Sequence, residues 1–253
     1  MKEEMKKFWN LTSYLAKSGF RIRNEGSFLG ILWYLLSPLL LFGMLFFIFS
    51  KNLGSGIEYY PLYLLLGLIM FNFFNASTGE SISVIRNNKS LLKSINLPRM
   101  SFVAGSVMKF AYSNAFEFVV FIILMILVRD NIVNALFYPL VMLFFAVFVF
   151  GISLIVASVS VYFLDFGNLW AFFCNLLWFA TPIFYALDTH PILSTFSYFN
   201  PVYYYITAAR DLVIYGEIPP AIILAGVVAF AAIFLVAGIL LFNRLKERFT
   251  EMI

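Results

Sequence analysis

The sequence predicts an all-α membrane protein with six transmembrane helices, and its composition and hydropathy pattern support that class. Hydrophobic residues make up 62% of the chain and charged residues only 12%, with a mean hydropathy of +0.92. So few charges cannot cover the surface of a soluble domain of this length. The apolar segments are long and lack the alternation of barrel strands, and a bilayer requires internally bonded backbone. Helices are therefore expected to span the membrane.

The distribution of Lys and Arg predicts that both termini lie in the cytoplasm. We expect spans at 31–50, 60–80, 102–128, 132–162, 168–187 and 218–242. Thirteen of the 17 Lys and Arg residues then share the side of the termini, at positions 2, 6, 7, 17, 21, 23, 86, 89, 93, 99, 244, 246 and 248. Lys51, Arg129 and Arg210 fall opposite, and Lys109 lies inside a span. Because cation-rich loops remain in the cytoplasm, both termini are expected there. We expect a single membrane domain, in which residues 1–28 form the interfacial helix and lead and residues 29–253 form the six-helix part.

Residues 2–20 have the pattern of an amphipathic helix lying at the membrane interface. Phe8, Trp9 and Leu15 fall on its apolar face, and Lys17 falls with the other lysines largely elsewhere. A plain membrane anchor explains the same pattern, because amphipathicity by itself specifies no partner.

The second span carries polar residues that helix packing or a cavity would explain. Asn72, Asn75 and Thr78 lie near one face of its later half. Lipid would leave the amides unsatisfied, so they are expected to face other helices or a cavity.

A short basic segment, residues 86–99, separates the second and third spans and is too polar to cross a membrane. Asn88 or Ser90 can cap a helix start, and Pro98 ends the helix. The apolar edge of this helix consists of Leu91, Leu92 and Ile95, and the cations of the segment are Arg86, Lys89, Lys93 and Arg99. We expect a short helix in the cytoplasm that suits a soluble partner. The alternative is a solvated loop whose cations only set topology.

Lys109 and Glu117 are charged residues of the third span. Lys109 lies close enough to the cytoplasmic end for its ammonium group to reach the headgroups. Glu117 lies near mid-membrane, two turns or more from Lys109, which is too far for a direct ion pair. We expect an interhelical hydrogen bond for Glu117, because no series of acids or histidines suggests a proton relay.

The connection between the fifth and sixth spans is predicted to enter the membrane and return. Residues 202–215 mix aromatic and polar side chains in a stretch too short to cross. Prolines at 182, 201, 219 and 220 interrupt helices around it. We expect a re-entrant or interfacial helical pair between His190 and Glu217.

Several short strings occur in a fixed order along nearly the whole chain. They are Arg21-x-Arg23 with 26–34 and Ser37-Pro38, Leu91-Leu92-Lys93 with Leu97-Pro98-Arg99, Thr181-Pro182-Ile183-Phe184-Tyr185, and Asn200-Pro201 followed by Tyr203 and Arg210. Together they resemble the membrane subunit of ABC-2-type exporters, specifically the branch that exports O-antigen, capsule and teichoic-acid polysaccharides. Where that family often has Arg-Asp after the fourth span, this chain has Leu164-Asp165, so any ion pair assigned to that Arg is absent.

The resemblance implies a permease subunit that moves a lipid-linked polysaccharide across the bacterial cytoplasmic (inner) membrane, driven by a separate ATPase. It implies no catalytic residue, metal or cofactor on this chain, since ATP and Mg would bind the partner. The interfacial helix (Phe8, Trp9, Leu15, Lys17) and the coupling loop (Lys89, Leu91, Leu92, Lys93, Ile95, Pro98, Arg99) would contact that ATPase. The outer gate would contain Thr181, Pro182, Tyr185, Asn200, Pro201, Tyr203 and Arg210.

Aromatic residues are the feature of the sequence that bears on a sugar substrate. A ring face stacks on the C–H face of a pyranose without requiring one hydroxyl pattern. Candidate passage-lining residues are Trp33, Tyr34, Phe71, Asn72, Phe74, Asn75, Trp170, Phe173 and Trp178, although packing or lipid contact also explains such rings. Six helices enclose little space, so we expect two copies related by a two-fold axis, with two ATPase subunits, around one lipid-linked glycan.

Other functions are open or excluded on sequence grounds. An exporter of a drug or lipid keeps the same architecture. A membrane transferase acting on a polyprenyl-phosphate lipid would need clustered carboxylates for a metal, and Glu80, Asp165 and Glu251 are isolated in sequence. The absence of a Gly-x-x-x-x-Gly-Lys-Ser/Thr string excludes a P-loop nucleotide site. Cys174 and His190 each occur once, which excludes disulfides and Cys/His clusters within the chain. The cations set topology rather than bind nucleic acid.

Overall fold

In the residues that it describes, which are 2–24, 32–51, 54, 56–94, 97–129, 132–187, 196–246 and 249, the computed structural model consists of helices joined by turns and short connections, with no strand. The predicted all-α class is therefore confirmed for this part of the chain. The elements are α1 (Lys2–Asn24), α2 (Leu32–Phe49), α3 (Tyr60–Asn87), α4 (Lys89–Ser94), α5 (Met100–Arg129), the 3₁₀ turn η1 (Val133–Phe137), α6 (Tyr138–Tyr162), α7 (Phe166–Ala180), α9 (Pro201–Ala209), the π-helical turn η3 (Arg210–Tyr215) and α10 (Ala221–Leu245).

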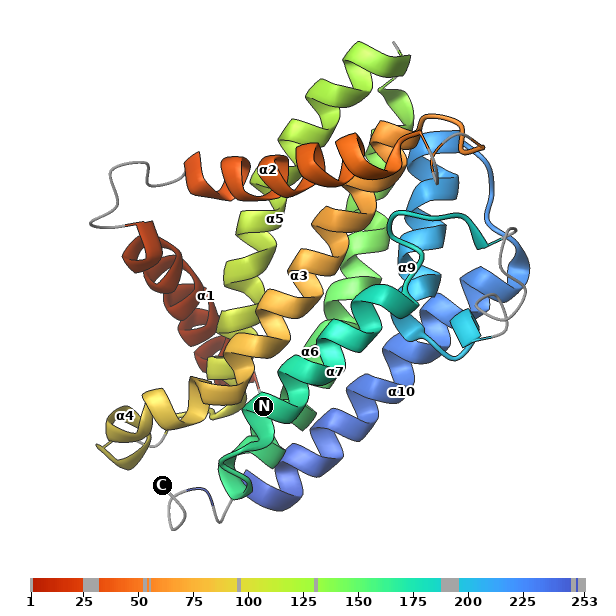
Figure 1. The fold of residues 1–253 in the computed structure, drawn as a ribbon. Helices are drawn as coiled ribbons and strands as arrows, with labels where there is room; N and C mark the ends of the chain where they lie inside the picture. Colours follow the sequence, from red (N-terminus) through yellow and green to blue (C-terminus); the bar gives the residue numbers. More distant parts are fainter. Residues whose placement is uncertain are drawn as a thin grey trace.

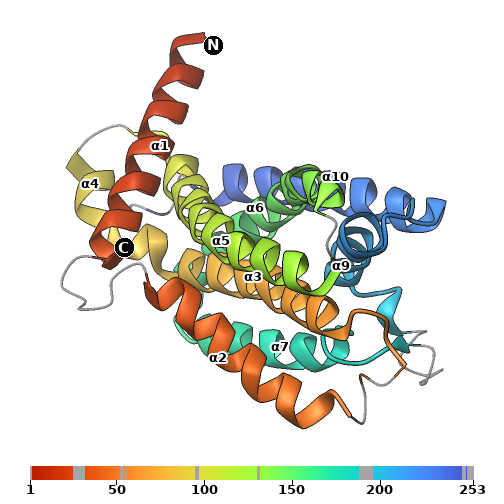
Figure 2. The ribbon, with the colours of Figure 1, turned by 90° about the horizontal axis from the view of Figure 1, so that it is seen from above.

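The long helices form a bundle with α3 at its centre. Seen from above, α6 and α10 lie on one side, α3 and α5 in the middle, and α2 and α7 on the opposite side (Figure 2). Of the most apolar 18-residue window of α3, 78% is buried, against 22% for α10. The main core therefore surrounds α3, with α5, α6 and α9 packed on it.

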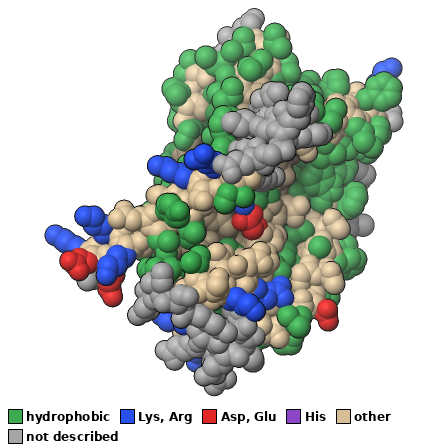
Figure 3. Space-filling model, turned by 90° about the vertical axis from the view of Figure 1, so that its left-hand side faces the viewer, with side chains coloured by type: hydrophobic (Ala, Val, Ile, Leu, Met, Phe, Trp, Pro, Cys, Tyr) green, Lys and Arg blue, Asp and Glu red, His purple; other side chains and the backbone are tan. Residues whose placement is uncertain are grey.

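Charge divides the bundle into two ends. The start of α1, the helix α4 and the end of α10 all lie toward the lower end in Figure 1, whereas α2 crosses near the top. Figure 3 shows hydrophobic side chains over the upper part of one face and most of that face's Lys and Arg over its middle and lower parts. The cation-rich segments predicted to share one side of the membrane thus gather at one end of the molecule.

Two glycines let α6 and α10 approach closely. A Cβ at Gly151 would lie 2.4 Å from the backbone carbon of Phe234, and a Cβ at Gly238 would lie 2.4 Å from the carbonyl oxygen of Gly151. Small residues at such crossings allow backbone contact between membrane helices. This contact fixes α10 against the bundle.

Four helical segments of the described chain are long and apolar enough to cross a membrane. They are Tyr60–Asn87, Met100–Val128, Val133–Tyr162 and Ala221–Leu245, close to the predicted second, third, fourth and sixth spans. The apolar stretches of α2 and α7 are shorter than 18 residues. At about 1.5 Å per residue, α7 is shorter than a hydrocarbon core of ~30 Å.

The predicted fifth span, residues 168–187, is wrong as a continuous helix. The helix α7 runs from Phe166 to Ala180 and ends at Thr181, whose backbone is extended (ψ 131°). A residue that precedes proline is disfavoured in the helical region, and Pro182 lacks the N–H that would continue the helix. The chain therefore leaves the helix where Thr181-Pro182 begins.

Candidate functional site

Arg210, at the junction of α9 and η3, ties the segment after α7 to α3. Its Nη1 donates to the carbonyl of Pro182 at 2.7 Å, and its Nη2 donates to the carbonyls of Ile183 at 3.0 Å and Tyr63 at 3.1 Å. Its Cζ also lies 3.3 Å from the centroid of the Tyr63 ring, a cation–π contact. Arg210 is only 3% exposed. The charge count placed this cation in an outer loop, whereas the fold buries it among carbonyl groups.

The same segment is held by Tyr63 and Asn200. The Tyr63 hydroxyl lies 3.2 Å from the carbonyl oxygen of Pro182 and 2.9 Å from that of Tyr185, and can donate to one of them at a time. The Asn200 amide donates to Thr181 Oγ1 at 2.8 Å, and its Oδ1 accepts from Val202 N, which caps α9. Most of the residues predicted for the outer gate are thus brought together.

Tyr63 was absent from that prediction. Tyr63 lies in the apolar helix α3 and belongs to no recognisable motif. Its contacts are with residues far away in sequence, so only the fold reveals them.

A cavity of about 250 Å³ lies beside this cluster. Its lining includes the aromatic residues Tyr203 and Tyr215 together with Arg210, Glu58 and Asp211. Burial raises the pKa of the Asp211 carboxyl to about 6, and the nearby Glu217 adds to this whereas Arg210 opposes it. The cavity combines aromatic residues with hydrogen-bonding groups, as small-ligand sites do.

The predicted passage-lining aromatics whose side chains the structure describes form one cluster between α3 and α7, and they are Phe71, Phe74, Trp170, Phe173 and Trp178. The Phe71 ring lies edge-on to Trp178 with centroids 5.0 Å apart, and Trp170 lies 5.3 Å from Phe173 and donates to Thr78 Oγ1 at 3.1 Å. Phe71, like Phe74, is 2% exposed and packs inside the bundle. Phe173, 47% exposed, is the ring of this set that the chain clearly presents at its surface.

Asn72 and Asn75 are exposed in the middle of α3, where most of the neighbouring residues are buried. Asn72 donates to Glu117 Oε1 at 2.8 Å, so the predicted interhelical hydrogen bond of Glu117 is confirmed. Glu117 is 4% exposed. Exposed amides in the middle of an apolar helix indicate a surface that does not face lipid.

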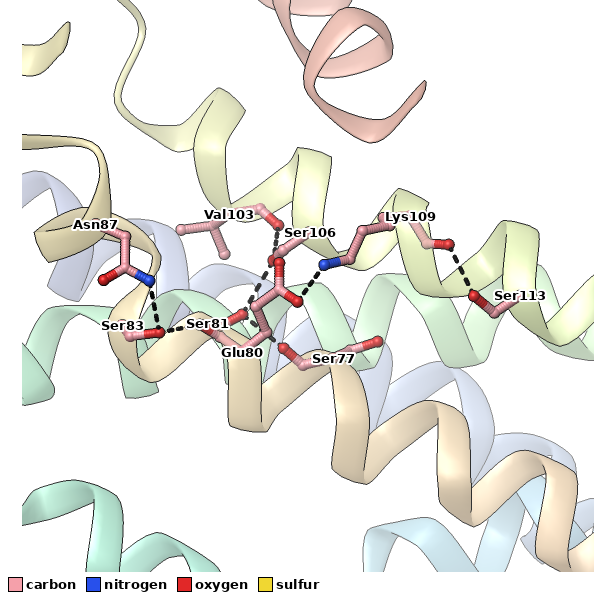
Figure 4. A network of polar contacts seen from close by, with 9 residues as sticks. All are labelled: Ser77, Glu80, Ser81, Ser83, Asn87, Val103, Ser106, Lys109 and Ser113. Carbon is pink, nitrogen blue, oxygen red and sulfur yellow. Dashed lines mark hydrogen bonds and ion pairs between the residues drawn. The ribbon is translucent and has the colours of Figure 1, made fainter. Parts of the chain in front are cut away.

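Glu80 of α3 and Lys109 of α5 form an ion pair, shown in Figure 4 beside a hydrogen bond between Ser81 and Ser106. The Lys109 side chain is 10% exposed and that of Glu80 34%. The prediction that Lys109 reaches the headgroups is therefore wrong, because a carboxylate on the neighbouring helix binds its ammonium group.

Sequence reasoning treated Glu80 as isolated, yet a signal was present. Along the chain, Glu80 and Lys109 lie equally far from the point between residues 94 and 95, in the connection between α3 and α5. Asn72 and Glu117 are also equally far from this point. Two adjacent antiparallel helices bring such residues side by side. The Asn72–Glu117 pair and the Glu80–Lys109 pair are about two helical turns apart.

The helix α1 packs on α5 near this ion pair. Thr12 and Ala16 are buried, and a Cβ at Gly105 would lie 2.9 Å from Leu15 Cβ. Trp9 is 55% exposed. The predicted apolar face is thus divided, since Leu15 packs against α5 while Trp9 is exposed.

The two surfaces predicted to contact an ATPase lie together at the lower end. Ser101 Oγ at the start of α5 donates to the carbonyl of Phe8 at 3.3 Å. Pro98 and Arg99 line one cavity with Phe8. A short helix, α4, forms where it was predicted, and Leu91 on it is 43% exposed.

Some predictions concern residues that the structure does not describe. They are the side chains of Trp33, Tyr34, Leu92, Lys93 and Ile95, and the part of the outer connection at 188–195.

Comparison with known proteins shows which family the chain resembles along most of its length. The pattern of the family described as "ABC-2 type transporter" matches residues 10–214. The chain is similar to the O-antigen export system permease protein RfbA of Klebsiella pneumoniae, with 28% identity over 100% of this chain and 98% of that protein. It is 25% identical to the protein of the same name from Myxococcus xanthus, over 99% of this chain and 98% of that one.

Proposed function

The chain belongs to the ABC-2 type transporter family, and from that premise we propose that it is the permease subunit of an ATP-driven exporter of a lipid-linked polysaccharide. The observation that carries the proposal is the end-to-end match to proteins named as O-antigen export permeases. A match over 98% of those proteins leaves no large part of their architecture without a counterpart here. The chain would work in the bacterial inner membrane.

The proposed topology has six spans with both termini in the cytoplasm. Four long apolar helices support it, together with the shorter α2 and α7. The cationic segments around α1, α4 and the end of α10 support a cytoplasmic lower end. The helix α9, followed by η3, would belong to a re-entrant segment, because it is short, mostly buried and tied to α3.

The proposed route lies between two copies of this chain. Asn72 and Asn75 of α3 and Phe173 of α7 support this because they are exposed on the chain and would offer a glycan amide groups and an aromatic ring. The outer cluster around Arg210 would close the upper end. Opening it would require the carbonyls of Pro182 and Ile183 to leave the guanidinium.

The proposed partners are two ATPase subunits, each seated on α4 and the neighbouring part of α1. Leu91 supports an apolar contact, since it is exposed on a helix that projects from the bundle. Hydrolysis would take place on the partner, with its ATP and Mg.

The test is an ATPase assay of this permease purified together with its ATPase, with and without candidate lipid-linked glycans. We expect one class of glycan to stimulate hydrolysis. Stimulation by drugs or simple lipids, with none by any glycan, would contradict the polysaccharide assignment and support the drug or lipid exporter.

A further inference from the structure

A cavity of about 710 Å³ lies at the lower end between three elements that are distant in sequence. Its polar lining comes from Lys7 of α1, Arg99 before α5, Lys246 after α10, and Glu4 and Asn243. Three cations and one carboxylate make the local charge positive. The Lys246 ammonium donates to Asn243 Oδ1 at 2.9 Å, which positions it at the end of α10.

The rest of the lining is apolar. It consists of Phe8, Leu97, Pro98, Met100 and Phe242. Phe242 is fully buried and is held edge-on against Phe249, which lies behind it. The cavity thus joins an apolar wall to a cationic rim.

Its position marks the boundary between hydrocarbon and water. The apolar part of α10 ends at Phe242, and Asn243, Arg244 and Lys246 follow at once. On α1, Trp9 lies next to Phe8 and is exposed, as expected for an indole at the headgroup level. A ligand in the cavity would therefore place its polar part at headgroup depth.

We propose that this cavity binds the phosphate headgroup of an anionic membrane phospholipid. Lys7, Arg99 and Lys246 bind the phosphate, while the apolar wall contacts the glycerol and first acyl carbons. Basic pockets between membrane helices on the cytoplasmic side suit such headgroups. A volume of about 710 Å³ is far more than a single phosphate ion needs and falls in the range of small-molecule pockets. The proposal does not depend on which substrate is exported.

The chain offers a matched control for the test. Lys6 neighbours Lys7 on α1, and Arg244 lies two residues before Lys246 on α10, yet neither lines the cavity. The double variant Lys7→Gln/Lys246→Gln removes two charges from the cavity. Lys6→Gln/Arg244→Gln removes two charges from the same helix ends.

The measurement is native mass spectrometry of the full chain, extracted in detergent and titrated with phosphatidylglycerol or phosphatidylethanolamine. We expect the wild type to retain phosphatidylglycerol preferentially. The cavity variant should bind it more weakly by roughly fivefold per removed cation, and the control variant should bind like the wild type. Elution as a single sharp peak in size-exclusion chromatography checks that each variant is folded.

Three results would overturn the proposal. The first is equal retention of the two phospholipids by the wild type, and the second is equal loss in both variants. The third is displacement of phosphatidylglycerol by an equimolar polyprenyl diphosphate or by the purified ATPase, which would identify either of those as the occupant.

Discussion

Breaking the Glu80–Lys109 ion pair should destabilise the bundle unequally, depending on which partner is removed. In Glu80→Gln the ammonium group of Lys109 stays in a side chain that is only 10% exposed. Removing one partner of a buried pair costs about 3–5 kcal/mol, and the partial exposure of Glu80 favours the lower value, about 3. In Lys109→Met the carboxylate of Glu80, 34% exposed, can be hydrated, so we expect a cost of ~1 kcal/mol.

The double variant Glu80→Gln/Lys109→Met should cost about 1 kcal/mol or less, because no buried charge is left without a partner. The singles and the double together form a double-mutant cycle with a coupling free energy of about 3 kcal/mol. The assay is reversible unfolding in mixed detergent and dodecyl sulfate micelles, followed by Trp fluorescence. Additive costs, or a larger cost for Lys109→Met than for Glu80→Gln, would refute the reasoning.

Three further predictions test other contacts, two of them with a control substitution. Gly151→Ala should lower stability by about 1–3 kcal/mol because the added methyl meets the α10 backbone. Gly43→Ala, where nothing lies within 4 Å, should be neutral or stabilising in the same unfolding assay. Arg210→Gln should cost about 3–6 kcal/mol, since hydrogen bonds from charged donors contribute ~1.5–3 kcal/mol each and Gln can replace about one of the three, and it should speed hydrogen exchange around 181–185. Unchanged exchange there would contradict the proposal that the cluster around Arg210 closes the upper end. Leu91→Asp should abolish co-purification of the ATPase, whereas Lys89→Ala should weaken it only at low salt; equal effects would rule out an apolar contact.

The sequence was sufficient to predict the helices whose signals are local. Unbroken apolar runs indicated α3, α5, α6 and α10, and the basic segment before Pro98 indicated α4. Thr181-Pro182 contained the signal that ends α7, yet the predicted span ran past it because apolar residues continue to Leu187. Hydropathy reports burial and does not distinguish a helix from an extended segment packed inside protein.

Pairings across the fold were harder to predict. The sequence marked Arg210 and Pro182 as separate motifs, and only the packing of η3 on α3 and the α7 connection showed that one binds the other. The pairing of Glu80 with Lys109 was predictable in principle, because the two residues lie equally far along the chain from the point between residues 94 and 95. Which aromatics face a passage was not predictable, because Phe71 and Phe173 have the same chemistry and differ only in that Phe71 packs inside the bundle whereas Phe173 is exposed.

The most direct test of the proposed function is transport itself. Inverted membrane vesicles containing this permease and its ATPase would be loaded outside with a lipid-linked glycan and then treated with a glycan-degrading enzyme that cannot cross the membrane. The account predicts that ATP, but not a non-hydrolysable analogue, makes the glycan resistant to the enzyme, and that Leu91→Asp abolishes the resistance. A glycan that stays fully degradable with ATP and wild-type protein, in vesicles that contain the assembled complex, would contradict it.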